Sequence, residues 1–166
     1  MSRFYRLFAA AATALAMSAT LTTAETAVFS AISPVELQKT LGPALSIGDQ
    51  GGDTVLEGEV DDVFFSIFFY NCDGGAFDGL AKPASACLSF EYRAYFDGYP
   101  DDGETLAAFN AAHHFGALWR DPLAEEALAL HMPVIVEGGV TEANIKATFR
   151  WWRETIRAFD TFMETR

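Results

Sequence analysis

The chain has few cysteines, few basic residues and, beyond residue 24, no long apolar run. Its 11 lysines and arginines stand against 23 acidic residues, which gives a net charge of −12. Such an acidic protein repels phosphate backbones and anionic lipid headgroups, so we predict no nucleic-acid partner. A membrane-spanning helix needs about 18 consecutive apolar residues, and no segment after residue 24 reaches that length.

Motifs for catalysis and metal binding are missing as well. The sequence contains no G-x-S-x-G, no H-E-x-x-H and no phosphate-binding loop. His113 and His114 are neighbours on a predicted helix, where adjacent side chains diverge and cannot easily share a metal. His131 stands alone in a predicted strand. We therefore predict no metal site, no cofactor and no enzymatic activity.

Three pairs of neighbouring acidic residues fall at predicted turns, namely Asp61-Asp62, Asp101-Asp102 and Glu125-Glu126. The segment 97–103 lacks the alternating oxygen ligands of a calcium-binding loop. A general acid/base pair would need a cleft and a raised pKa, and the sequence indicates neither. We interpret these carboxylates as turn residues that keep the protein solvated.

The first 24 residues are typical of a secretory signal peptide. Arg3 and Arg6 give the positive start, residues 7–21 the apolar middle, and Thr22 and Ala24 the small residues of a cleavage site. We expect cleavage near Ala24, which leaves one periplasmic or secreted domain over 25–166 with no stable membrane anchor. The leader holds two arginines and no acidic residue, so its removal would change the net charge by two units, from −12 to −14.

Export bears on the only two cysteines, Cys72 and Cys87, because an oxidising compartment favours a disulfide between them. The bridge would close a glycine-rich loop of about 15 residues and stabilise the fold by roughly 3 kcal/mol. A redox-active pair is the less favoured alternative, because the C-x-x-C spacing and a neighbouring cation are both missing. The remaining alternative is that both cysteines are free thiols.

Turn signals and hydrophobic periodicity divide the chain into elements. Ser33 and Glu36 form a capping box around Pro34, which predicts a helix that ends near Leu41. Strands are expected at 44–47, 54–60, 63–72, 87–97, 117–120 and 127–136, a second helix at 104–115 and a last helix from Thr141. The order α-β-β-β-β-α-β-β-α predicts an α+β fold with an antiparallel sheet of about six strands packed by helices.

The segment 63–72 is the most β-like part of the chain. One of its faces carries Val63, Phe65, Ile67 and Phe69, and the other carries Phe64, Phe68 and Tyr70. Because both faces are apolar, we expect a central strand that is covered on both sides. The last helix carries a single apolar stripe of Ile145, Phe149, Trp152, Ile156, Phe159 and Met163, which must lie against a sheet or another subunit.

Five aromatic residues make up a candidate binding face. Phe64, Phe68 and Tyr70 lie on the second face of the central strand, and Trp151 and Phe162 lie off the main stripe of the last helix. If the helices cover these side chains, they belong to the core. If not, they form an exposed apolar patch, which usually marks a surface for a partner or a ligand.

Several segments resemble the YbjN-domain family. The run from Phe109 to Gly116 resembles its Trp-Asn…Phe-Gly segment, and the run from Gly138 to Thr141 resembles its Gly-Gly-Val-Thr step into the last helix. The Phe-Tyr-x-Cys strand end at 69–72 and the Cys-x-Ser-Phe strand start at 87–90 also fit. The similarity spans residues 32–163, nearly the whole predicted domain.

This resemblance implies an α/β sandwich similar to type III secretion chaperones, in which helices pack on a curved antiparallel sheet. It also implies a sensory or regulatory role with no established catalytic residues. The chain departs from the family in the helix at 104–115, which is often richer in asparagine and basic residues and here has alanines and two histidines. A role for a basic helix surface is therefore not carried over.

These observations lead to two expectations about function. The first is an exported, non-enzymatic binding or regulatory protein that holds a protein partner, or forms a homodimer, through apolar sheet or helix faces. The alternative is a periplasmic carrier of a small hydrophobic ligand, since 15 phenylalanines could line a cavity as well as fill a core.

Overall fold

A computed structural model describes residues 27–73, 81–97, 103–121 and 127–165. The predicted signal peptide and the acidic pairs at 101–102 and 125–126 lie outside the described residues.

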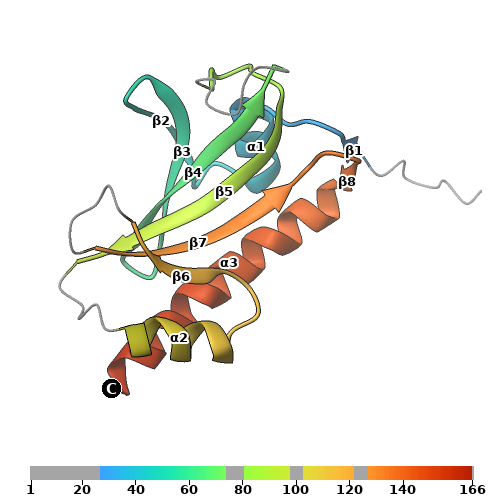
Figure 1. Ribbon diagram of the computed structural model, residues 1–166. Coiled ribbons are helices and arrows are strands. Elements are labelled where there is room, and N and C mark those ends of the chain that lie inside the picture. The colour runs from blue at the N-terminus through green and yellow to red at the C-terminus, as the bar shows by residue number, and fades with distance from the viewer. Residues whose placement is uncertain (1–26, 74–80, 98–102, 122–126, 166) are drawn as a thin grey trace, which may run out of the picture.

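The described residues form a six-stranded antiparallel sheet, a small two-stranded sheet and three helices (Figure 1). In chain order the elements are β1 (Val28–Phe29), α1 (Pro34–Leu41), β2 (Ser46–Gln50), β3 (Asp53–Val60), β4 (Val63–Cys72), β5 (Cys87–Phe96), α2 (Gly103–Ala112), β6 (Ala117–Arg120), β7 (Leu128–Ile135), β8 (Val140–Thr141) and α3 (Glu142–Glu164). The large sheet has the order β2-β3-β4-β5-β7-β6 and is not closed, so β2 and β6 are its edges. The predicted α+β class and element order are confirmed, and the short β1–β8 pair is an addition.

Helix α1 begins as the sequence predicts. The Ser33 hydroxyl accepts a hydrogen bond from the Glu36 amide at 3.3 Å, and the Glu36 carboxylate accepts one from the Ser33 amide at 2.9 Å. Pro34 occupies the first turn, where its missing N–H costs nothing. The helix ends at Leu41 because Gly42 has a φ of 109°, which a residue with a side chain rarely adopts.

Helix α3 runs along one face of the large sheet (Figure 1). Its predicted stripe is confirmed, since Ile145, Trp152, Ile156 and Phe159 are buried and Phe149 and Met163 pack against the same core. The Trp152 ring stacks on Tyr92, with 5.5 Å between ring centroids, and Phe159 lies 4.2 Å from Phe96. None of the described helices is long and apolar enough to cross a membrane.

Helix α2 is shorter than predicted, because it ends at Ala112 and not at Phe115. Gly116 has a φ of 76°, and the chain turns there into edge strand β6. The Asn110 side chain explains how this turn is held: its amide donates to the Leu118 carbonyl at 2.9 Å, and its oxygen accepts from the Leu118 amide at 2.7 Å. The Asn110 side chain thus pairs with both backbone groups of Leu118, as a residue of an adjacent strand would, and joins α2 to β6.

Candidate interaction surface on the open face of the sheet

The two faces of β4 differ sharply in burial. Phe65, Ile67 and Phe69 are buried in the core, where Phe65 packs against Trp152 of α3, whereas Phe64 is 74% exposed. The expectation that this strand is covered on both sides is therefore wrong, although β4 is central in the sheet. Helices α1 and α2 both pack beside α3, so the three described helices share one face and leave the other uncovered.

We call this uncovered surface the open face. Strand register places its residues at Glu57 and Glu59 on β3, Phe64, Ser66, Phe68 and Tyr70 on β4, Ser89, Glu91, Arg93 and Tyr95 on β5, His131, Pro133 and Ile135 on β7, and Trp119 on β6. Its most exposed large apolar side chains are Phe64, 74% exposed, and Ile135, 70% exposed, which lie toward different ends of this face.

Arg93 occupies the centre of the open face and is held by four polar partners. Its Nε lies 2.8 Å from Oε1 of Glu91, and its terminal nitrogens donate to the hydroxyls of Tyr70 at 3.0 Å and Tyr95 at 3.2 Å. Tyr95 in turn donates to Asp121 at 2.8 Å, and a guanidinium nitrogen of Arg93 lies 3.9 Å from the same carboxylate. The positive charge is therefore balanced within the surface itself.

Aromatic rings frame this guanidinium. Its central carbon lies 4.7 Å from the centroid of the Phe68 ring and 5.6 Å from that of Trp119, both within cation–π range. The Trp119 ring stacks on His131 at 5.2 Å, and Nδ1 of His131 lies 3.3 Å from Oε2 of Glu91. These contacts fix the aromatic side chains in place, so less side-chain conformational entropy is lost when a partner binds.

The electrostatics of the centre follow from these contacts. Burial acts to raise the pKa of Glu91, but hydrogen bonds with His131 and Arg93 outweigh it and hold that pKa below its ordinary value. Burial also raises the pKa of Tyr70 and of Tyr95, so both phenols stay protonated. For Arg93, burial is outweighed by its bonds to Tyr95 and Glu91, which raise its pKa and keep it charged.

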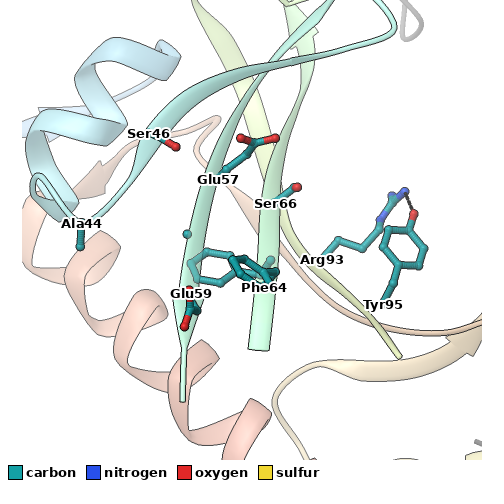
Figure 2. Close-up of a pocket in the computed structure, with 10 residues that line it drawn as sticks. Ala44, Ser46, Glu57, Glu59, Phe64, Ser66, Arg93 and Tyr95 are labelled. Carbon is teal, nitrogen blue, oxygen red and sulfur yellow. Dashed lines mark hydrogen bonds between the residues drawn. The ribbon is translucent and has the colours of Figure 1, made fainter. Parts of the chain in front are cut away.

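A hollow of about 470 Å³ opens on the open face beside the β2 edge (Figure 2). We call it the acidic hollow, because its lining includes Glu57 and Glu59 together with Ser46, Phe64, Ser66 and Arg93. Glu59 lies directly opposite Phe64 in the strand register, and Glu57 lies opposite Ser66. A second hollow of about 370 Å³ lies beside Tyr70, Glu91 and Ile135.

The structure divides the predicted binding face. Phe64, Phe68 and Tyr70 do come together on the open face, whereas Trp151 and Phe162 lie on α3, on the other side of the sheet. Phe162 packs against the core, 5.4 Å from Phe109, and the Trp151 ring stacks on Phe115 at 4.4 Å. The five residues therefore do not form one surface.

The polar centre and its neighbours were not among the binding residues predicted from the sequence. Arg93, Glu91 and Tyr95 alternate with apolar residues along 87–97, so their shared face could be read from the pattern. Trp119 and Ile135 gave no such signal, because only the pairing of β7 with β5 and β6 brings them beside β4. Among the described residues no group of three histidines, cysteines or carboxylates could hold a metal ion.

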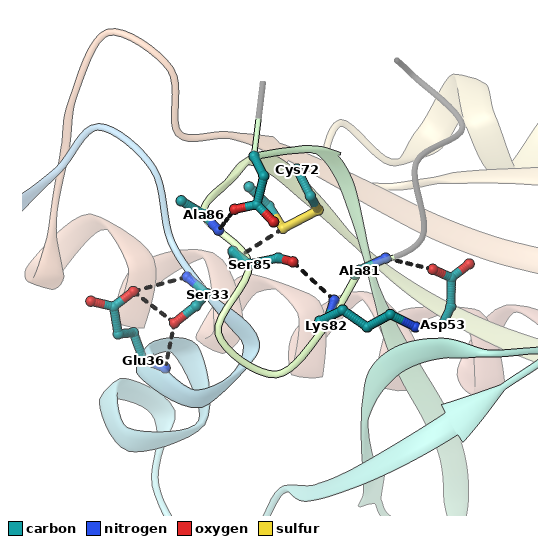
Figure 3. Close-up of a disulfide and its surroundings, with 10 residues drawn as sticks. Ser33, Glu36, Asp53, Cys72, Ala81, Lys82, Ser85 and Ala86 are labelled. Atoms are coloured by element: carbon teal, nitrogen blue, oxygen red, sulfur yellow. Dashed lines mark hydrogen bonds between the residues drawn. A yellow bond between two sulfur atoms is a disulfide. The ribbon is translucent and has the colours of Figure 1, made fainter. Parts of the chain in front are cut away.

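The predicted disulfide is present. Cys72 and Cys87 are directly opposite residues of β4 and β5, and both are buried (Figure 3). The Asp73 carboxylate accepts a hydrogen bond from the Ala86 amide at 2.8 Å, and hydrogen bonds from Ser85 and Ala86 lower the pKa of Asp73. The bridge closes the end of the β4–β5 hairpin and lies away from the centre of the open face.

Residues 43–165 match the family model of YbjN, which carries the description "Putative bacterial sensory transduction regulator". The match covers most of the chain, which therefore belongs to the YbjN family. Among solved structures, one similar chain is described as "Crystal structure of YbjN, a putative transcription regulator from E. coli". It is 16% identical, the alignment covers 76% of this chain and 82% of that one, and the TM-score is 0.44. A search of curated proteins found no match.

Proposed function

We propose that this YbjN-family member is an exported, non-enzymatic binding protein that holds a protein partner on the open face of its sheet. The observation that carries the proposal is the apolar exposure of that face around an ordered polar centre. Phe64 and Ile135 are 74% and 70% exposed, and they flank the Arg93 cluster on one continuous sheet surface. Large exposed apolar side chains gathered on one face usually mark an interaction site.

The composition of the open face also resembles that of protein interfaces. Tyrosine, tryptophan, phenylalanine and arginine are enriched in interface centres, and the open face gathers Tyr70, Tyr95, Trp119, Phe68 and Arg93. The polar groups of the centre are bonded to one another, which suits a surface that is later covered and supports binding over catalysis. Export rests on the sequence of residues 1–24 alone.

The test is capture of a partner from the native exported fraction by the tagged protein. Phe64→Ser and Ile135→Ser should abolish capture, because they remove the two most exposed apolar anchors of the open face. Trp151→Ser is the matched control, since Trp151 is also an exposed aromatic residue but lies on the helix side. Loss of capture with Trp151→Ser, and not with the open-face variants, would overturn the proposal.

The carrier hypothesis makes a different prediction. Phe65, Phe90, Phe96, Phe109 and Phe159 pack against neighbouring aromatic rings in the core, so a small ligand would have to occupy one of the surface hollows. Mass spectrometry of an organic extract of the purified protein checks this. A retained lipid or metabolite that is lost on Phe64→Ser would favour the carrier, and a bare protein with a captured polypeptide favours the binding protein.

A further inference from the structure

The acidic hollow differs from the rest of the open face in having uncompensated charge. Glu57 and Glu59 are both exposed and have no ion-pair partner among the described residues. Arg93 is the one basic residue in the lining, and its guanidinium is already bonded to Glu91, Tyr70 and Tyr95. Residues two apart on a strand face the same way at about 7 Å, so the two carboxylates combine into one negative field beside the Phe64 ring.

Gly48 on the edge strand β2 leaves room for the Glu57 carboxylate to reach the edge of the sheet. A Cβ atom at Gly48 would lie only 2.6 Å from the carboxyl carbon of Glu57, so the Glu57 side chain lies across the backbone of β2. Any side chain at position 48 would displace it. Glu57 thereby reaches over β2, which pairs only with β3 and has its other edge free among the described residues.

A free edge strand can accept an extended segment by backbone pairing, and the side chains of that segment then alternate between the two faces of the sheet. A segment added beside β2 would place a side chain next to the Glu57 carboxylate, with Phe64 and Glu59 further along the open face. A basic side chain suits that position, because it meets the Glu57 carboxylate at the sheet edge and lies in the negative field that Glu57 shares with Glu59. An acidic or a second identical chain does not, since self-pairing of β2 would bring two Glu57 side chains together.

We propose that the partner contributes an extended basic segment that pairs with the edge of β2 and places a lysine or arginine side chain in the acidic hollow. This inference rests on the proposed function and specifies the chemistry of the partner. It also explains how an acidic protein selects its partner: the apolar part of the open face supplies contact area, and the acidic hollow sets the charge and orientation of the partner.

The test is titration of the isotope-labelled protein with three blocked heptapeptides in which valine alternates with lysine, glutamine or glutamate. The lysine peptide should shift the backbone amides of β2 and weaken in binding as salt is raised from about 50 to 200 mM. Glu57→Gln and Glu59→Gln should each weaken it about 2- to 5-fold, as expected for exposed ion pairs. Gly48→Ala, which displaces Glu57 without changing any charge, should weaken it similarly.

Asp160→Asn is the matched control, because it removes one exposed carboxylate from α3, on the helix side. Equal weakening by Asp160→Asn, equal binding of the glutamine or glutamate peptide, or shifts confined to other surfaces would overturn the inference. So would displacement of the lysine peptide by spermine with the same affinity, since the hollow would then select a small polycation.

Failure of this inference can be told apart from failure of the proposed function. A partner that is captured through Phe64 and Ile135, with no loss on Glu57→Gln or Glu59→Gln, would overturn the basic segment and leave the open face as the binding surface. Capture that survives Phe64→Ser and Ile135→Ser but is lost on the Glu57 and Glu59 variants would overturn the proposed use of the apolar face.

Discussion

The two faces of the large sheet are built from the same strands but differ in burial and in the kind of contacts they make. On the helix side, Phe65, Tyr92 and Trp152 form a dry aromatic cluster whose ring centroids lie 5.5–6.5 Å apart. On the open face, Phe68 and Trp119 pack around the charged Arg93 group instead, and Phe64 contacts solvent. One face therefore stabilises the fold, and the other is available for recognition.

The largest expected effect on stability comes from a comparison of a buried and an exposed tryptophan that are neighbours on α3. Trp152→Ala should lower the free energy of unfolding by about 3–5 kcal/mol, because it leaves a cavity between Tyr92 and Phe65. Trp151→Ala, at an exposed position, should cost less than about 1 kcal/mol. Urea denaturation gives both values. Similar losses for the two variants would contradict the burial described here, and Trp152→Phe provides a milder variant if Trp152→Ala does not fold.

Removing the disulfide should have the next largest effect. Replacing Cys72 and Cys87 together by serine should cost roughly 3 kcal/mol, mainly because the unfolded chain regains freedom when its closed loop is opened. The wild-type protein unfolded with and without reductant provides the control. Equal stability of the oxidised and reduced protein would show that the bridge does not support the fold.

The polar centre of the open face should contribute a smaller amount. Arg93→Ala leaves the half-buried Glu91 carboxylate without its main cation, so we expect a loss of about 1–3 kcal/mol. Combining it with Glu91→Gln should recover part of this loss, because the unpaired charge is gone. A double-mutant cycle measured by denaturation checks the coupling, and simple additivity of the two variants would argue against it.

The same pair gives a dependence on pH. Because the folded protein lowers the pKa of Glu91, its contribution to stability is complete above the unfolded pKa of about 4.3 and is lost as the pH falls through the folded value. Glu91→Gln should therefore flatten the acid side of the stability profile below about pH 4. Arg93→Ala should flatten it too, and an unchanged slope in both variants would contradict the assignment.

The smallest expected effect on stability comes from Phe64, one of the two apolar anchors of the proposed binding surface. Phe64→Ser should change the free energy of unfolding by no more than about 0.5 kcal/mol, because the ring is largely in water already. Thermal melts of the variant and the wild type suffice to test this. A large loss of stability would mean that Phe64 belongs to the core, and the comparison of the two faces would fail.

Most of the fold could be predicted from hydrophobic periodicity and capping signals in the sequence. The capping box of α1, the stripe of α3 and the alternation of 87–97 are local patterns, and local patterns are set by backbone geometry that the sequence specifies directly. The disulfide was also predictable, because cysteines at the end of one strand and the start of the next face each other in an antiparallel hairpin. The end of α2 was misjudged, since the Asn110 contact with Leu118 that holds it is not periodic.

The sequence by itself determined the α+β elements, their order, the acidic charge and the pairing of Cys72 with Cys87. Only the tertiary structure decided which apolar face stays open, because Phe64 and Phe65 are equally hydrophobic and differ only in whether α3 covers them. Tertiary structure also decided that Tyr70 reaches Arg93 from the neighbouring strand and that Glu57 lies over Gly48. Both contacts depend on how strands pair, β4 with β5 and β2 with β3, and not on the alternation within one strand.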